Sequence, residues 1–290
     1  MAGQSPANRR RIAIRSWGLE RLLLGDAKVV WCILFFAWGL VFLATLTGNG
    51  HWLHGDPLAE HPSWAVGMNL LTFMAAWLIM TIAMMLPTSL PLLQLFAKVS
   101  REQKLDNGEF LLLLFIAAYL TIWSLFALLI FLGDLGWHRL INSQPWLIEN
   151  SSWFAGITLL LAGAFQFSSL KEQCLRVCRH PFGFLAQHYR RGIKATWNLG
   201  VRHGLYCLGC CWALMFVMFS VGVTHLAGML ILSAVMAIEK TSSWGRALVP
   251  CVGFALLVWG GLTLWSADTG TAILTGSQCS VNQSVARITR

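Results

Sequence analysis

The stretch AVGMNLLTFMAAWLIMTIAMMLPTSLPLLQLF, residues 65–96, decides the fold class. It contains no Asp, Glu, Lys, Arg or His. About 20 consecutive apolar residues suffice to cross the ~30 Å hydrocarbon core of a bilayer as a helix, so this stretch is longer than one crossing needs. Pro87 and Pro91 lie inside it, and a proline removes a helix hydrogen bond. We therefore expect a transmembrane helix that is kinked or broken near these prolines.

Apolar runs of the same kind recur along the whole chain. Hydrophobic residues make up 57% of the 290 residues and charged residues only 11%, whereas soluble domains carry about 25% charged residues. This composition excludes a soluble globule and predicts an all-α, polytopic transmembrane helical bundle of about seven spans. The other expected spans are residues 29–47, 110–133, 153–170, 204–221, 226–238 and 248–266.

Lysine and arginine alternate between the connections. They concentrate in residues 1–28 and after the second, fourth and sixth runs, whereas the connections after the odd runs hold only Arg139. Because positive loops stay cytoplasmic, this pattern predicts a multi-pass protein of the bacterial inner membrane, N-in and C-out. The expected parts are a basic cytoplasmic segment (1–28) without a cleaved signal, a transmembrane domain (29–266) containing a cytoplasmic Cys/Arg-rich loop (171–203), and an extracytoplasmic tail (267–290). The net charge of +9 then reflects topology and contact with membrane lipids rather than nucleic-acid binding.

Five of the eight cysteines fall on two facing helix ends. Cys174 and Cys178 are spaced i, i+4 at the inner end of the fourth run, and Cys207, Cys210 and Cys211 are spaced i, i+3, i+4 in the first inner turns of the fifth. Each set therefore shares one helix face, and the two runs are joined on the same side. Thiolates select soft ions, and a reducing cytoplasm disfavours stable disulfides. The pattern predicts a metal site for copper(I), with zinc or iron as alternatives.

Methionines extend this donor set. Thioethers bind copper(I) but hardly bind zinc, so methionines near the thiols favour copper. The methionines expected to act as secondary donors are Met80, Met84, Met85 and Met215. The alternative is that these methionines only pack within the bundle, which is also our expectation for Cys32 and Cys251. On the opposite side, His51, His54 and His61 are either a divalent-ion site or solvated loop residues.

Other functional classes find little support in the sequence. The span cores carry almost no ionisable residue, which argues against an ion-coupled transporter. No catalytic triad, P-loop or dinucleotide motif is present, so an enzyme is disfavoured. We expect a metal-handling membrane protein that exchanges its ion with a metallochaperone or other membrane subunits. The alternatives are an accessory or assembly subunit of a larger membrane complex and a thiol–disulfide redox protein using Cys207, Cys210 and Cys211.

Several blocks of the chain resemble a bacterial family of predicted metal-binding integral membrane proteins. The resemblance covers about residues 65–245 and implies a fold and a metal site rather than a reaction. Its departure is at Thr224 and His225, where relatives are expected to show methionine and asparagine. The matching blocks are Ala76–Met80, Ala83–Pro87, Gln166, Leu170–Lys171, Cys174–Leu175, Cys178–Pro181, Gly204, Cys207–Met215 and Glu239–Lys240.

Overall fold

The fold is taken from a computed structural model of the whole chain, which describes residues 28–46, 63–102, 108–143, 151–221, 226–242 and 244–269. Over these residues the protein is all-helical, as predicted. The expected histidines of the first loop, Thr224, His225 and the terminal segments 1–27 and 270–290 lie outside the described residues.

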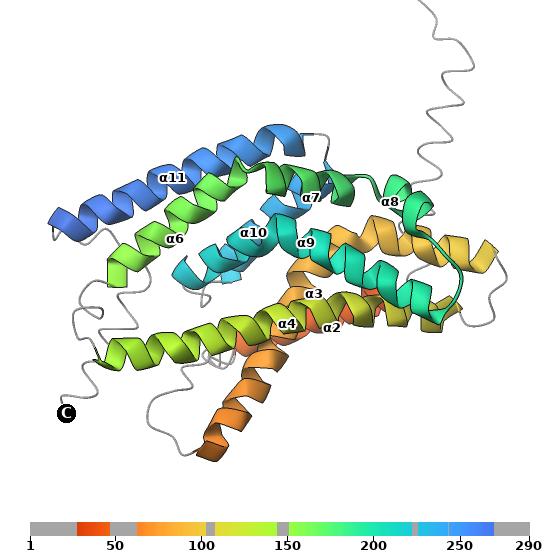
Figure 1. The fold of residues 1–290 in the computed structure, drawn as a ribbon, viewed down its shortest axis with the longest axis horizontal. Helices are drawn as coiled ribbons and strands as arrows, with labels where there is room; N and C mark the ends of the chain where they lie inside the picture. The colour runs from red at the N-terminus through yellow and green to blue at the C-terminus, as the bar shows by residue number, and fades with distance from the viewer. Residues whose placement is uncertain are drawn as a thin grey trace, which may run out of the picture.

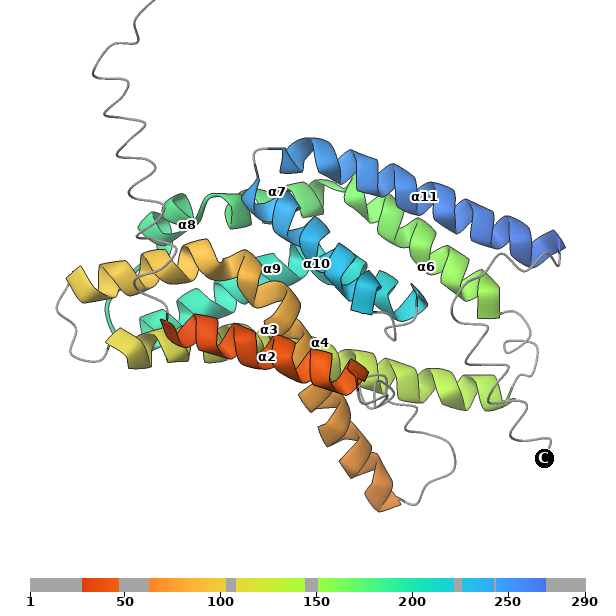
Figure 2. The same ribbon diagram turned by 180° about the vertical axis from the view of Figure 1, so that it is seen from behind.

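Every apolar run predicted from the sequence is helical, but the expected single span 153–170 is wrong at its end, because the chain breaks at Phe167 and Ser168 between two helices. The helices are α2 (Lys28–Leu46), α3 (Ser63–Glu102), α4 (Gly108–Ser143), α6 (Ser151–Gln166), α7 (Ser169–Arg179), α8 (Pro181–His188), α9 (Ile193–Val221), α10 (Leu226–Thr241) and α11 (Gly245–Thr269). The long helices α4, α6, α9 and α11 lie side by side in two layers, with α10 between them and α2 and α3 behind α4 (Figures 1 and 2).

Helix α3 bends in its middle. It continues through Pro87 and Pro91 without a break, and both views show its two halves pointing in different directions (Figures 1 and 2). The expected kink is therefore present. Thr88 and Ser89 each donate a hydroxyl hydrogen bond to the carbonyl of Met85, at 2.7 Å and 3.4 Å. These hydroxyls thus supply donors to a backbone carbonyl at the bend.

Within the described residues, five helices are long and apolar enough to cross a membrane: α2, α3, α4, α9 and α11. The helices α6 and α7 pass the same test only as a pair bent by 62°, which makes up to six candidate spans. Helix α10 has 16 residues, about 24 Å at 1.5 Å per residue, and is shorter than the hydrocarbon core. The prediction of about seven spans is thus supported for five or six of them, and the remaining apolar run forms the short helix α10, which packs against α3, α9 and α11 and is exposed along one side.

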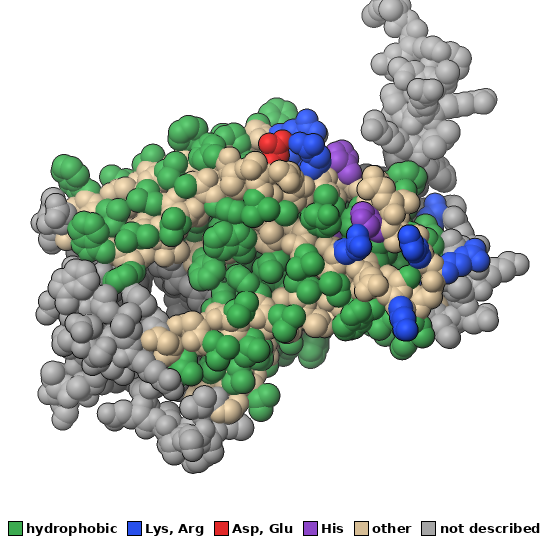
Figure 3. Space-filling view, viewed as in Figure 1, with side chains coloured by type: hydrophobic (Ala, Val, Ile, Leu, Met, Phe, Trp, Pro, Cys, Tyr) green, Lys and Arg blue, Asp and Glu red, His purple; other side chains and the backbone are tan. Residues whose placement is uncertain are grey.

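The chain exposes apolar surface along its helices. The face in Figure 3 is largely hydrophobic, and Lys, Arg and His side chains gather toward the end that holds α7 and α8. A soluble domain buries such side chains, whereas a bilayer solvates them. Trp265, Phe35 and Leu46 illustrate this, with relative exposures of 71%, 72% and 84%.

Candidate metal site

Helix α7 begins at a sharp bend in the chain. Ser168 caps its N-terminus by accepting a hydrogen bond from the backbone N–H of Lys171 at 3.1 Å. The cap lets the chain leave α6 and continue at an angle of 62°. The bend directs α7 against α9, and both Cys174 and Cys178 lie on this short helix, as their spacing predicted.

Helices α7 and α9 pack closely because α9 has a glycine at the contact. A Cβ atom added to Gly209 would lie 2.6 Å from the sulfur of Cys174. Only glycine leaves room for this sulfur at the surface of α9. The packing brings the cysteines of both helices into one buried cluster, with Cys178 partly exposed at its margin.

Three sulfurs form a continuous series from α7 into α9. The Sγ atoms of Cys178 and Cys210 are 4.0 Å apart, and those of Cys210 and Cys211 are 3.4 Å apart. A metal ion at about 2.3 Å from both sulfurs of a pair would subtend about 120° across the first pair and about 95° across the second. The first angle matches three-coordinate thiolate binding, whereas the second is smaller, so Cys210 and Cys211 would have to move apart slightly to hold one ion together. All cysteines in the described part of the chain are free thiols.

Cys207 has polar partners that sequence reasoning did not assign. Its sulfur lies 3.0 Å from the hydroxyl of Tyr119 on α4 and 3.1 Å from Nζ of Lys240 on α10. Lys240 also donates to the hydroxyl of Thr88 at 3.1 Å. An ammonium at this distance stabilises a thiolate, so Cys207 is held by a protein cation in this structure.

The methionines named from the sequence join the same buried cluster. Met80, Met84 and Met85 of α3 and Met215 of α9 are at most 2% exposed and pack together with Cys174, Cys207, Cys210 and Cys211. Thioethers and thiols are therefore gathered in one apolar core, although Met80, Met84 and Met85 lie about 90 residues or more before the cysteines in the chain. Cys32 and Cys251 are exposed and lie outside this cluster.

The cysteines do not form a closed metal cage. Among the described residues, no group of three or more His, Cys, Asp or Glu side chains is arranged to hold a metal ion. The donor chemistry nevertheless fits a soft ion, because the cluster offers sulfur atoms in an apolar surrounding.

A buried ion pair lies beside the cluster. Lys171 on α7 donates to Glu239 on α10 at 2.7 Å, with side-chain exposures of 1% and 2%, and Lys171 also donates to Gln166. Arg179 donates through Nε to the backbone carbonyl of Glu239 at 2.7 Å. The two contacts to Glu239 hold α7 against α10. They join residues 60 or more positions apart in the chain, so no local sequence pattern predicts them.

Long apolar helices thus surround a buried cluster of thiols and thioethers, which defines the class as an all-helical protein with a sulfur-rich core. The model of the PpoB2 family, described as copper chaperone, matches residues 74–263. The chain belongs to this family, which agrees with the copper preference drawn from its thiols and thioethers. Comparisons with curated proteins and with solved structures give no match.

Proposed function

We propose that the protein is an integral membrane copper chaperone that binds copper(I) at Cys174, Cys178, Cys207, Cys210 and Cys211. The main support is that the sulfurs of Cys178, Cys210 and Cys211 follow one another at 4.0 Å and 3.4 Å between α7 and α9. Met80, Met84, Met85 and Met215 then act as secondary donors from the surrounding core. Copper is the cargo in this proposal, received from one partner and passed to another.

The arrangement of exposure sets an order for copper binding. Cys178 is partly exposed, whereas Cys210 and Cys211 are each 1% exposed. A copper(I) carrier can therefore exchange ligands first with Cys178, after which Cys210 and Cys211 replace the carrier's donors. Such stepwise exchange keeps the soft ion bound to sulfur throughout, which avoids releasing it to water.

The same proposal places the chain in the bacterial inner membrane, with its N-terminus inside. The five long apolar helices and the bent α6–α7 pair support insertion. Arg246 at the start of α11 interacts with Arg179 at the end of α7, so these two helix ends lie on the same side. Helix α10 therefore brings the chain back to that side between α9 and α11. In this proposal the short α10 makes the seventh crossing, packed against its neighbours with one side exposed. The gathering of basic side chains toward α7 and α8 supports the cytoplasmic assignment of that end (Figure 3).

Metal analysis of the purified protein tests the copper site. The full-length chain, purified in detergent under reducing conditions and loaded with copper(I), should retain copper after exchange against a weak chelator. Cys178→Ser and Cys210→Ser should each reduce the retained copper by at least half. The matched control is Cys251→Ser, which removes an exposed thiol outside the cluster. Equal retention in Cys210→Ser and Cys251→Ser would refute the site.

Two other functions remain as outcomes of related experiments. An accessory subunit that uses its cysteines only for packing should co-purify with its partner complex in Cys207→Ser and Cys210→Ser as well as in the wild type. A thiol–disulfide redox protein should form a mixed disulfide that can be trapped when Cys211 is replaced, since Cys210 and Cys211 lie 3.4 Å apart. Neither result is expected from a copper chaperone.

A further inference from the structure

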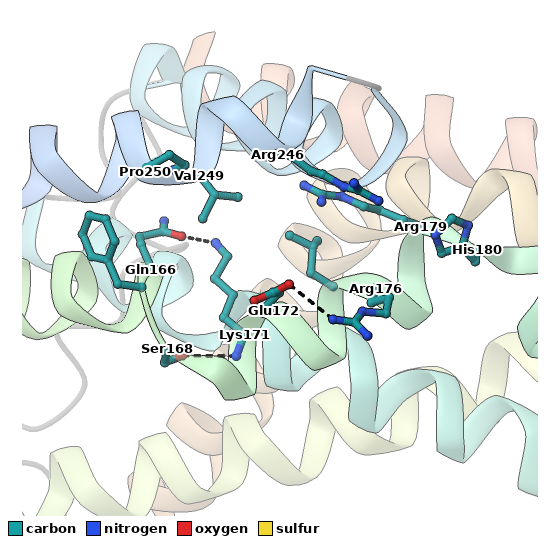
Figure 4. Close-up of a pocket in the computed structure, with 12 residues that line it drawn as sticks. Gln166, Ser168, Lys171, Glu172, Arg176, Arg179, His180, Arg246, Val249 and Pro250 are labelled. Carbon is teal, nitrogen blue, oxygen red and sulfur yellow. Dashed lines mark hydrogen bonds and ion pairs between the residues drawn. The ribbon is translucent and has the colours of Figure 1, made fainter.

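A polar cavity lies along the side of α7 next to the one that carries the thiols. It has a volume of about 570 Å³, within the usual range for small-ligand sites. It opens between α7 and the start of α11, as the close-up in Figure 4 shows. The residues that line it are Gln166, Phe167, Ser168, Lys171, Glu172, Leu175, Arg176, Arg179, His180, Arg246, Val249 and Pro250.

The lining carries more positive charge than the carboxylates near it offset, although Arg179 also interacts electrostatically with Glu239 and Glu172. Among the described residues that line the cavity, Glu172 is the only carboxylate, and it already pairs with Arg176 at 3.3 Å. Lys171 is neutralised from outside the lining by Glu239. The guanidinium groups of Arg179 and Arg246 therefore face the cavity without a carboxylate of the lining between them.

These two guanidinium groups lie next to each other. Figure 4 shows Arg179 reaching from α7 and Arg246 from α11 so that their ends meet, and the two groups interact electrostatically. Like charges at close range repel, and the repulsion is relieved when an anion binds both. Nη2 of Arg179 is buried and has no hydrogen-bond partner among the described residues.

A second unpartnered donor points to the same ligand chemistry. Gln166 is 4% exposed and lines the cavity, and its Nε2 has no hydrogen-bond partner within the described part of the chain. A buried donor left without an acceptor is costly, so both the amide and the guanidinium favour an acceptor-rich ligand. Phosphate oxygens supply several acceptors at once, and guanidinium forks bind them in pairs.

We propose that this cavity is a binding site for a phosphate group, held by Arg179 and Arg246, with Gln166 as a further donor. The phosphate belongs either to the headgroup of an anionic phospholipid or to a soluble phosphate. Phe167, Leu175, Val249 and Pro250 give the cavity an apolar side, which suits the glycerol and acyl part of a lipid. The lining of the cavity contains none of the five cysteines, so the phosphate site and the proposed copper site share no ligand, although Arg179 interacts electrostatically with Cys210.

Binding measurements on the full-length protein in neutral detergent test this site. Isothermal titration is carried out with short-chain phosphatidylglycerol in one arm and with inorganic phosphate in the other. Wild type should bind at least one of them, and the arm that responds identifies the source of the phosphate. Arg246→Gln should weaken that binding about tenfold, since it removes one charge-assisted contact. Arg246→Glu should weaken it further, because the new carboxylate would pair with Arg179.

The matched control is Arg202→Gln, which removes an exposed positive charge on α9 away from the cavity. Its affinity should equal that of the wild type, and all variants should retain the helical circular dichroism of the wild type. The proposal is overturned if neither ligand binds the wild type. It is also overturned if Arg246→Gln and Arg202→Gln lower the affinity equally, since that result would reflect surface charge alone. Copper retention by the Arg246 variants should be unchanged, which separates this site from the proposed chaperone activity.

Discussion

Breaking the buried ion pair between Lys171 and Glu239 should destabilise the protein far more than breaking an exposed pair on the same helix. Glu239→Gln leaves the ammonium of Lys171 buried without a countercharge. Loss of one partner of a buried pair costs about 3–5 kcal/mol. The comparison is Glu172→Gln, which breaks the 3.3 Å pair with Arg176, whose side chains are 68% and 74% exposed. An exposed i, i+4 pair contributes about 0.3–0.5 kcal/mol.

The two variants should therefore differ by at least about 2.5 kcal/mol in their free energy of unfolding. Unfolding by sodium dodecyl sulfate in mixed micelles, followed by circular dichroism, measures this difference. The double variant Lys171→Met, Glu239→Gln should recover most of the loss, because it removes the unpaired charge and fills the space with an apolar side chain. If Glu239→Gln and Glu172→Gln are equally stable, the pair between α7 and α10 does not hold the helices together. Failure of the double variant to recover stability would show that Glu239 acts through other contacts.

Three further predictions concern the packing around the thiols. Gly209→Ala should lower the free energy of unfolding by about 1–2 kcal/mol and displace Cys174, because the added Cβ would lie 2.6 Å from its sulfur. The control Gly228→Ala has open space around the new Cβ and should raise the free energy of unfolding by up to about 1 kcal/mol in the same assay. In maleimide labelling of the reduced native protein, the exposed Cys32 and Cys251 should react fast, whereas the buried Cys207, Cys210 and Cys211 should react only after unfolding. Fast labelling of the three buried cysteines would contradict the packing of α7 against α9. Lys240→Met should cost about 1–3 kcal/mol, since it leaves the hydroxyl of Thr88 and the sulfur of Cys207 without their shared donor; an unchanged unfolding midpoint would show that this contact is dispensable.

The helices and the cysteine faces followed from local patterns. Apolar runs and helical spacing depend only on neighbours in the chain, which is why the runs are helical, the break at residues 167–168 apart, and why Cys174 and Cys178 share one face of α7. The kink of α3 followed from Pro87 and Pro91 for the same reason. The sharp angle before α7 also has a sequence pattern that predicts it. Ser168 precedes a polar, amphipathic segment, which is typical of the start of a new helix.

The contacts between distant residues could not be predicted in this way. Lys240 meets Cys207, and Glu239 meets Lys171, only because α10 packs against both α7 and α9. The same holds for the close approach of Arg179 and Arg246. The shortness of α10 could be predicted from the sequence. The run 226–238 has only 13 residues, about 20 Å as a helix, which is less than the hydrocarbon core requires.

Helix α7 carries two chemistries on neighbouring sides. The lining of the cavity contains none of the five cysteines, so a phosphate in the cavity and a copper ion at the thiols would share no ligand. Arg179 nevertheless follows Cys178 in the chain and interacts electrostatically with Cys210. Both sites depend on one helix of 11 residues, so a rotation of α7 about its axis would disturb the two together. Measurement of copper retention with and without the phosphate ligand would therefore show whether filling the cavity moves the thiols.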